Sequence, residues 1–130
     1  MKADTVIKNG RIVTPAGIVE GDLAIQSGKI VSVEAGLAGS GNIIDATDHF
    51  VLPGGVDPHA HIEQMSGMGQ WNADTFETAT RSAAMGGTTS VISFAAQNVG
   101  QSIRETVAEY AGRARRGAMI DHAFHITVTD

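Results

Sequence analysis

Alternating apolar and polar residues predict short β-strands and tight turns in the first third of the chain. Asn9-Gly10 lies between two such runs and is typical of a two-residue hairpin turn, because both residues accept a positive φ. Ser27-Gly28 predicts a second hairpin in the same way. We therefore expect roughly five short antiparallel strands in residues 1–53, forming the N-terminal portion of a small β-sandwich. The runs that carry this strand pattern are residues 5–8, 11–14, 22–26, 29–33, 43–44 and 50–52, the last two of which are very short.

After residue 54 the pattern changes to alternating strands and helices. Capping boxes predict that helices begin at Asp74 and Ser102, and glycines end them at Gly86 and Gly117. The predicted box partners are Glu77 and Glu105. The run 88–94 is β-branched and mostly apolar, which is typical of a strand buried on both faces. A β-α-β-α-β order predicts parallel strands joined by right-handed crossovers.

Three polar residues alternate at the end of the first of these strands. Asp57, His59 and His61 follow an apolar run and the turn Pro53-Gly54-Gly55. In an extended backbone they share one face, and the histidine Cα atoms are about 6.6 Å apart. Both imidazoles can then reach one metal ion. The alternative is a pair of structural histidines, but a site at the carboxyl end of a strand is where α/β barrels place their chemistry.

Two motifs resemble the amidohydrolase superfamily. Residues 52–61 are similar to its first-strand motif, and residues 84–92 resemble the second barrel strand of the dihydropyrimidinase and hydantoinase branch. The resemblance extends from Thr5 to Asp130. It implies a TIM-like (β/α)8 barrel, of which residues 54–130 form strands 1 to 3. It also implies hydrolysis of a cyclic amide C–N bond, with a bridging hydroxide attacking the ring carbonyl.

The resemblance also implies which residues serve the site. His59 and His61 carry over as metal ligands. Asp57 shares their face one layer deeper, and we expect it to orient them. A complete site in the family holds divalent metal, expected to be two zinc ions. Its other ligands are a carboxylated lysine and two more histidines, and an aspartate acts as proton shuttle; all of these are expected from beyond residue 130. No catalytic residue then lies within this chain. The following loop is expected to line the substrate pocket, although an ordinary βα loop explains it equally well: Glu63, Gln64, Met65, Ser66, Met68 and Trp71.

Length limits what this chain can form. Its 130 residues are too few for a complete barrel, which needs about 250. We therefore expect two domains, 1–53 and 54–130, at the beginning of a longer enzyme. The partner expected from the resemblance is a small cyclic amide, and the parent enzyme is expected to be a homodimer or homotetramer. The 130 residues alone are expected to be inactive and poorly soluble.

Composition excludes several classes. Hydrophobic residues make up 42% and charged residues 18% of the chain, which is incompatible with a disordered tail. The net charge of −5 argues against a nucleic-acid surface, and Arg113, Arg115 and Arg116 are predicted to form a solvated helix face. The absence of cysteine excludes a disulfide scaffold and thiolate metal ligands. No apolar segment predicts a signal peptide or a membrane span, so we expect a cytoplasmic protein.

Several alternatives stay open at this point. A nucleotide-binding fold would need a glycine-rich turn directly before a helix, whereas Gly86-Gly87 precede a strand. His122 and His125 point to opposite faces of a strand and cannot bind one ion together. A dihydroorotase, an allantoinase or another amidohydrolase would share the first motif. A non-catalytic truncated relative acting through protein contacts is the alternative from another class.

Overall fold

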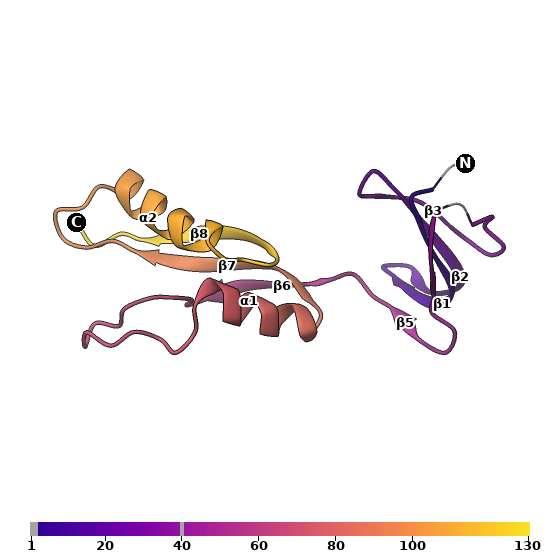
Figure 1. The fold of residues 1–130 in the computed structure, drawn as a ribbon, viewed down its shortest axis with the longest axis horizontal. Helices are drawn as coiled ribbons and strands as arrows, with labels where there is room; N and C mark the ends of the chain where they lie inside the picture. The colour runs from indigo at the N-terminus through magenta and orange to yellow at the C-terminus, as the bar shows by residue number, and fades with distance from the viewer. Residues whose placement is uncertain (1–2, 40) are drawn as a thin grey trace. The chain divides into compact units, whose positions relative to one another are not determined.

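The computed structural model describes residues 3–39 and 41–130, and the chain divides into two compact units, Met1–Pro53 and Gly54–Asp130 (Figure 1). The first unit is a five-stranded sheet in the order β3-β2-β1-β4, with β5 also paired to β1. Its strands are β1 Thr5–Thr14, β2 Gly17–Gln26, β3 Lys29–Glu34, β4 Asn42–Asp45 and β5 Phe50–Val51.

The sheet of the first unit is mixed, which corrects the expectation of antiparallel strands only. β1 pairs antiparallel with β2 but parallel with both β4 and β5. Strand β1 pairs along both of its edges. Its hairpin partner β2 lies along one edge, and the shorter strands β4 and β5 lie along the other in the same direction as β1. All strands of residues 3–39 and 41–53 belong to this one sheet, so a second sandwich layer is not seen in that part of the chain.

The predicted hairpin at Asn9-Gly10 is wrong, whereas the one at Ser27-Gly28 is confirmed. β1 runs through Asn9, which adopts φ 60° and shifts the register with β2 between Ile7 and Gly10. The Asn9 residue therefore forms a bulge. The chain reverses only between Thr14 and Gly17, which face each other in the ladder.

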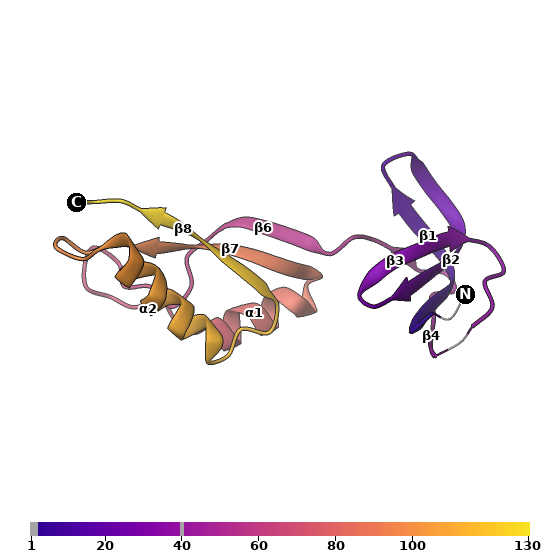
Figure 2. The same cartoon turned by 90° about the horizontal axis from the view of Figure 1, so that it is seen from above.

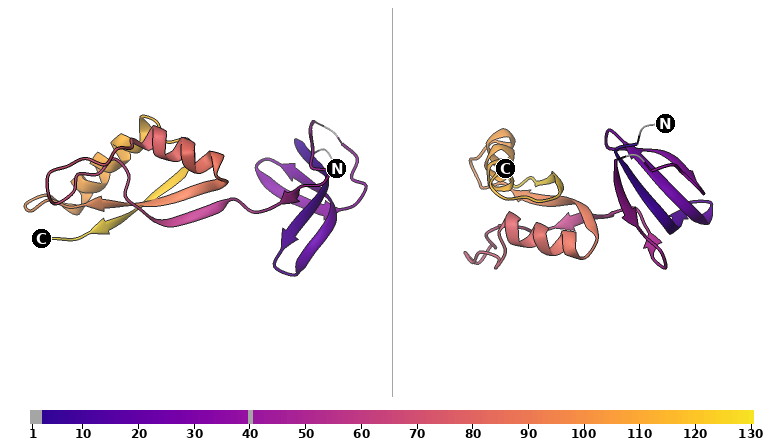
Figure 3. Two further views of the ribbon diagram at one scale, coloured as in Figure 1. Left: turned by 90° about the horizontal axis from the view of Figure 1, so that it is seen from below. Right: turned by 45° about the vertical axis from the view of Figure 1, so that its right-hand side comes forward.

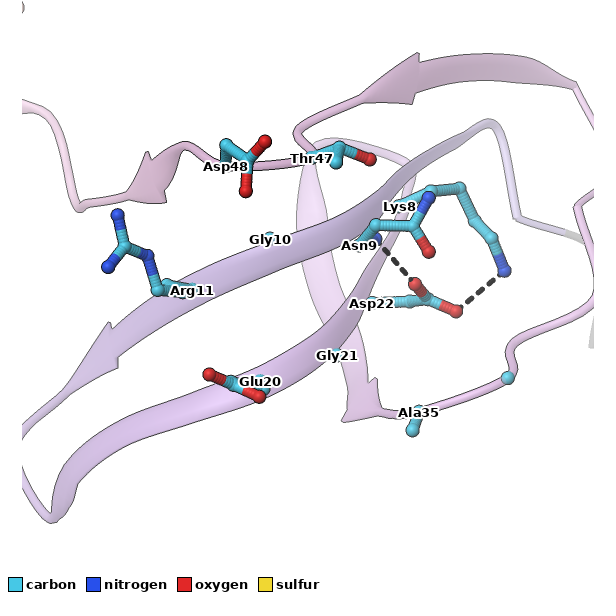
Figure 4. A pocket seen from close by; sticks show the side chains of 11 residues that line it. Lys8, Asn9, Gly10, Arg11, Glu20, Gly21, Asp22, Ala35, Thr47 and Asp48 are labelled. Atoms are coloured by element: carbon cyan, nitrogen blue, oxygen red, sulfur yellow. Dashed lines mark hydrogen bonds and ion pairs between the residues drawn. The ribbon is translucent and has the colours of Figure 1, made fainter.

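A buried carboxylate explains the bulge. Asp22 on β2 accepts hydrogen bonds from the Lys8 ammonium at 2.6 Å and from the Asn9 backbone N–H at 2.9 Å (Figure 4). A third hydrogen bond comes from the Leu37 N–H at 2.9 Å. Because the side chain of Asp22 takes the Asn9 N–H, the left-handed residue is stabilised inside the strand rather than at a turn.

The second unit is a three-stranded parallel sheet in the order β6-β7-β8. Both helices lie on one face of this sheet (Figures 2 and 3). Between them and the sheet is a core of Ile62, Phe76, Val91 and Ala114. The elements are β6 Gly55–Ala60, α1 Phe76–Met85, β7 Thr88–Ala96, α2 Ile103–Arg115 and β8 Asp121–Thr127.

The placement of the helices argues against a doubly wound nucleotide-binding sheet. Such a sheet carries helices on both faces and reverses its strand order at the ligand site. Here the strand order follows the sequence, and α1 and α2 share one face. Residues 54–130 thus form an open sheet of parallel strands in sequence order, with both helices on one face.

The two faces of β7 differ, contrary to the expectation that both are buried. Val91, Ser93 and Ala95 are buried under the helices. Ile92 and Phe94, on the opposite face, are only half-buried because no layer of the described chain covers them. That open face is the one on which the candidate site lies.

The two helix caps differ in how far the sequence predicts them. At α2 the box between Ser102 and Glu105 is confirmed. At α1 the N-cap is Thr75, one residue later than predicted, and its box partner is Thr78. Glu77 does not reach back because it pairs with Arg81 along the helix. Within the described ranges, neither helix has the length and apolarity needed to cross a membrane.

Candidate metal centre

The end of β6 brings His59 and His61 onto the open face of the sheet. Phe94 of the neighbouring strand β7 packs against both rings, with centroid distances of 4.6 Å to His59 and 5.0 Å to His61. The two imidazole rings are themselves 5.4 Å apart. The period-two spacing of the histidines thus places both rings against the same neighbour, as the sequence predicts.

The ring separation fits a shared metal ion. An imidazole centre lies about 3.2 Å from a metal bound at about 2.1 Å, so two rings on a tetrahedral ion are roughly 5 Å apart. The observed centroid distance of 5.4 Å is close to that value. Two imidazoles supply only two of the three protein ligands that catalytic zinc sites generally keep.

Gln64 holds the His61 ring in one orientation. The Gln64 Oε1 atom lies 2.8 Å from His61 Nδ1. When Nδ1–H donates to this carbonyl oxygen, the lone pair of Nε2 is free to bind a cation. A hydrogen bond of this kind commonly fixes the tautomer of a metal-binding histidine.

Asp57 lies on the same strand, but its carboxylate contacts the backbone. Its Oδ1 atom accepts the His59 N–H at 3.0 Å. Asp57 therefore fixes the main chain that carries His59, and any orienting effect on the imidazole acts through that main chain. The alternation of strand positions does not predict this contact, because it says only which face a side chain shares and not which backbone group it reaches.

His125 shares the open face, whereas His122 does not. The His125 Nε2 atom lies 3.0 Å from the Pro58 carbonyl oxygen, and its ring is 5.0 Å from Phe94. The His122 ring packs near Phe76 on the helix face, at 6.4 Å. The prediction that these two histidines point to opposite faces is confirmed. His125 is paired with Phe94 in the ladder between β7 and β8, and this pairing places it on the same face as His59 and His61. The sequence alone does not give the pairing, so it does not reveal this position of His125.

The loop after β6 forms a small hollow beside His61. Its pocket has a volume of about 330 Å³. An antiparallel bridge between Met65 and Trp71 closes the loop, and the Ser66 N–H donates to the Gln70 carbonyl at 2.7 Å. Five of the six predicted pocket residues line this hollow: Gln64, Met65, Ser66, Met68 and Trp71.

Glu63 is the exception, and its placement corrects the prediction for that residue. Its φ of 47° turns the side chain away from the hollow and toward the helices. There the carboxylate accepts the Phe76 N–H at 3.1 Å and pairs with Arg116 at 2.9 Å. Glu63 therefore serves the N-terminus of α1, whose free N–H groups attract a negative charge.

Residues 3–39 and 41–130 place no third metal-binding side chain beside the two histidines. No group of three or more histidine, cysteine or acidic side chains in these ranges is placed to hold a metal ion. Ser93 contributes a neutral contact, since its hydroxyl accepts the Ile62 N–H at 3.3 Å just after the histidines. Among the described residues, His59 and His61 are the candidate ligands whose rings lie close together, at 5.4 Å.

Known proteins resemble this chain in sequence and in fold. A D-hydantoinase from Rhizobium radiobacter is 46% identical over 127 residues, which covers 98% of this chain and 28% of that protein. Dihydropyrimidinase 2 of Caenorhabditis briggsae is 34% identical, covering 95% and 24%. A solved structure of a D-hydantoinase superposes with a TM-score of 0.90 at 46% identity, over 98% of this chain and 28% of that one.

The chain matches only part of the length of these relatives. No protein-family model matches the chain. The chain spans about 28% of the length of the first of these curated relatives. Over nearly its whole length, the chain is homologous to the N-terminal portion of D-hydantoinases and dihydropyrimidinases.

Proposed function

We propose that the chain forms the N-terminal part of a metal-dependent hydrolase that opens cyclic amides of the hydantoin and dihydropyrimidine type. The observation that carries the proposal is the pair His59 and His61, whose rings lie 5.4 Å apart at the end of a parallel strand. Relatives named for hydantoin and dihydropyrimidine chemistry support this substrate class.

In this proposal His59 and His61 hold a divalent cation, with zinc as the expected ion and two ions in the complete centre. A bound cation of this kind acidifies water toward a pKa of about 7 and polarises a carbonyl oxygen. Gln64 keeps His61 in the tautomer that leaves Nε2 free, and Phe94 shields one side of both rings from water. Asp57 secures the backbone of His59. The remaining ligands come from strands outside these 130 residues, within a closed (β/α)8 barrel.

The loop hollow is the proposed contact for the substrate ring. Met65, Met68 and Trp71 offer apolar and polarisable surface, which adapts to varied ring substituents. Gln64 and Ser66 provide polar atoms beside it. The hollow opens next to His61, so a cyclic amide held there lies beside the proposed metal.

Replacing each histidine tests the proposal in the full-length protein. His59→Asn and His61→Asn are expected to lower kcat/KM for hydantoin and dihydrouracil by at least about 100-fold, because each removes a direct metal ligand. Bound zinc, measured by atomic absorption, is expected to fall in parallel. His49→Asn is the matched control, since His49 is exposed in the first unit and contacts the Thr47 carbonyl.

Retained activity and full zinc content in both variants would reject the two histidines as ligands. A wild-type protein that binds zinc but opens neither ring would instead reject the substrate class. The proposal also includes a cytoplasmic homodimer or homotetramer, which sedimentation of the full-length protein and fractionation of the cells that make it would test.

A further inference from the structure

Arg113 on α2 is not the solvated residue that the sequence predicts. Only 13% of its side chain is exposed. Its guanidinium lies 4.5 Å from the Tyr110 ring centre and 4.9 Å from that of Trp71. It also pairs with Glu109 one turn earlier on the helix. The guanidinium is therefore held between its own helix and the loop that follows β6.

A hydrogen bond ties this guanidinium to the start of the loop. Arg113 Nη1–H donates to the Glu63 carbonyl oxygen at 2.6 Å. Glu63 is the left-handed residue at which the chain leaves the strand, with φ 47°. Its carboxylate binds Arg116 and the Phe76 N–H. The turn into the loop is thus fixed by contacts from both helices.

The loop itself has few other restraints toward the rest of the unit. Met68 at its tip is 85% exposed, and Met65 and Trp71 are exposed as well. Its base contacts the metal strand, because Asn72 Nδ2–H donates to the His61 carbonyl at 2.9 Å and Gln64 contacts the His61 ring. A shift of the loop therefore alters both the hollow and the surroundings of His61.

We propose that Arg113 is a positioning residue, which clamps the 63–72 loop to α2 and so sets the shape of the hollow beside His61. The clamp combines a charge-assisted hydrogen bond at one end of the loop with cation–π contact to Trp71 at the other. Its consequence for substrate choice rests on the proposed function, but the clamp itself does not.

Hydrogen exchange tests the clamp directly. Arg113→Met keeps a side chain of similar reach and removes the guanidinium. The Ser66 and Asn72 amides are hydrogen-bonded within the loop, and their exchange is expected to become about tenfold faster. Without the guanidinium, the loop can open without losing the hydrogen bond to Glu63 and the cation–π contact with Trp71. Arg115→Met, an exposed arginine on the same helix, is the control and is expected to leave exchange unchanged.

The same experiment separates positioning from a general loss of stability. Amides of β7 report on the core of the second unit and are expected to keep their wild-type exchange. Acceleration of β7 and the loop by the same factor, or no acceleration of the loop, would overturn the clamp. Arg113→Lys retains the charge but not the planar fork, and it is expected to restore only part of the protection. Full protection in this variant would show that a positive charge alone suffices, and it would overturn the role given to the planar guanidinium.

Substrate discrimination gives the second readout in the full-length protein. Hydantoins with a hydrogen or a bulky group on ring carbon 5 are compared. Arg113→Met is expected to change the ratio of their kcat/KM values by about tenfold, mainly through KM for the bulky substrate, with zinc content unchanged. An unchanged ratio alongside faster loop exchange would reject the role in specificity. An inactive wild-type protein would contradict the proposed function, while the exchange result would still decide the clamp.

Discussion

Asp22 shows how one buried side chain determines the path of a strand. It is 2% exposed and receives hydrogen bonds from Lys8, Asn9 and Leu37. The Lys8 ammonium, followed by the Asn9 N–H, lowers the pKa of Asp22 below its ordinary value despite burial. The ionised carboxylate therefore joins β1, β2 and the segment after β3, and the bulge at Asn9 depends on it.

Asp22→Asn is expected to lower the free energy of unfolding by about 2–4 kcal/mol at pH 7, because it leaves Lys8 without its counter-charge and puts an amide N–H against backbone donors. The folded pKa lies below the unfolded one, so the stabilisation is present above about pH 4 and is lost as the pH falls through the lowered pKa. Urea unfolding at pH 7 and pH 3 measures both values.

The matched control for Asp22 lies two residues earlier on the same strand. Glu20→Gln removes a carboxylate that is exposed, and its effect is expected to stay within about 0.5 kcal/mol. An Asp22→Asn protein as stable as the wild type at pH 7, or a difference that grows on acidification, would contradict the role given to the ion pair.

Single residues also show what the sequence can predict of the site. The shared face of His59 and His61 follows from their spacing, since strand geometry fixes which side chains lie together, and their role as metal ligands stays a prediction. Glu63 does not, because its left-handed φ sends the side chain toward the helices. Arg113 does not either, because its partner Glu63 is fifty residues away along the chain. Both contacts depend on how β6 and α2 pack.

At the scale of secondary structure, local rules succeed where no distant group competes. Ser27-Gly28 makes the predicted turn, with positive φ at both residues. Asn9-Gly10 has the same local preference, but Asp22 offers the Asn9 N–H a partner inside the sheet. The alternating order of strands and helices in residues 54–130 is predicted correctly, because apolar periodicity and capping residues are local features of the sequence. The mixed strand pairing of the first unit is not predicted, because it depends on contacts between segments that are distant in the sequence.

The cap of α2 is a local device whose contribution can be measured. The Ser102 hydroxyl accepts the Glu105 N–H at 3.2 Å, and the Glu105 carboxylate accepts the Ser102 N–H at 3.0 Å. Hydrogen bonds from Ser102, through its hydroxyl first and then its N–H, lower the pKa of Glu105. Ser102→Ala is expected to lower the free energy of unfolding by about 1 kcal/mol, as loss of an N-cap usually does. Thermal unfolding followed by circular dichroism measures the change.

A serine inside the other helix provides the comparison for the cap. Ser82 is exposed within α1, so Ser82→Ala is expected to leave stability unchanged or raise it slightly, because alanine favours the helix. Equal effects of the two substitutions would mean that the capping box contributes nothing beyond helix propensity.

At the scale of the whole chain, the main liability is apolar surface on the first unit. Ile18, Ile30, Ile43 and Leu52 are exposed, and β3, which carries Ile30, is at one end of the strand order. An edge strand with exposed apolar side chains can pair with another copy. The 130-residue chain is therefore expected to associate as its concentration rises.

A charge on the edge strand should reduce that association. Ile30 is 64% exposed, so Ile30→Lys places an ammonium on β3 without removing core packing, in the way that natural edge strands use lysine. Sedimentation velocity across a concentration series is expected to show a smaller shift toward larger species than the wild type. Val99→Lys adds the same charge to an exposed position in the second unit and is expected to associate like the wild type. If both substitutions reduce association equally, net charge rather than the edge of the first sheet controls it.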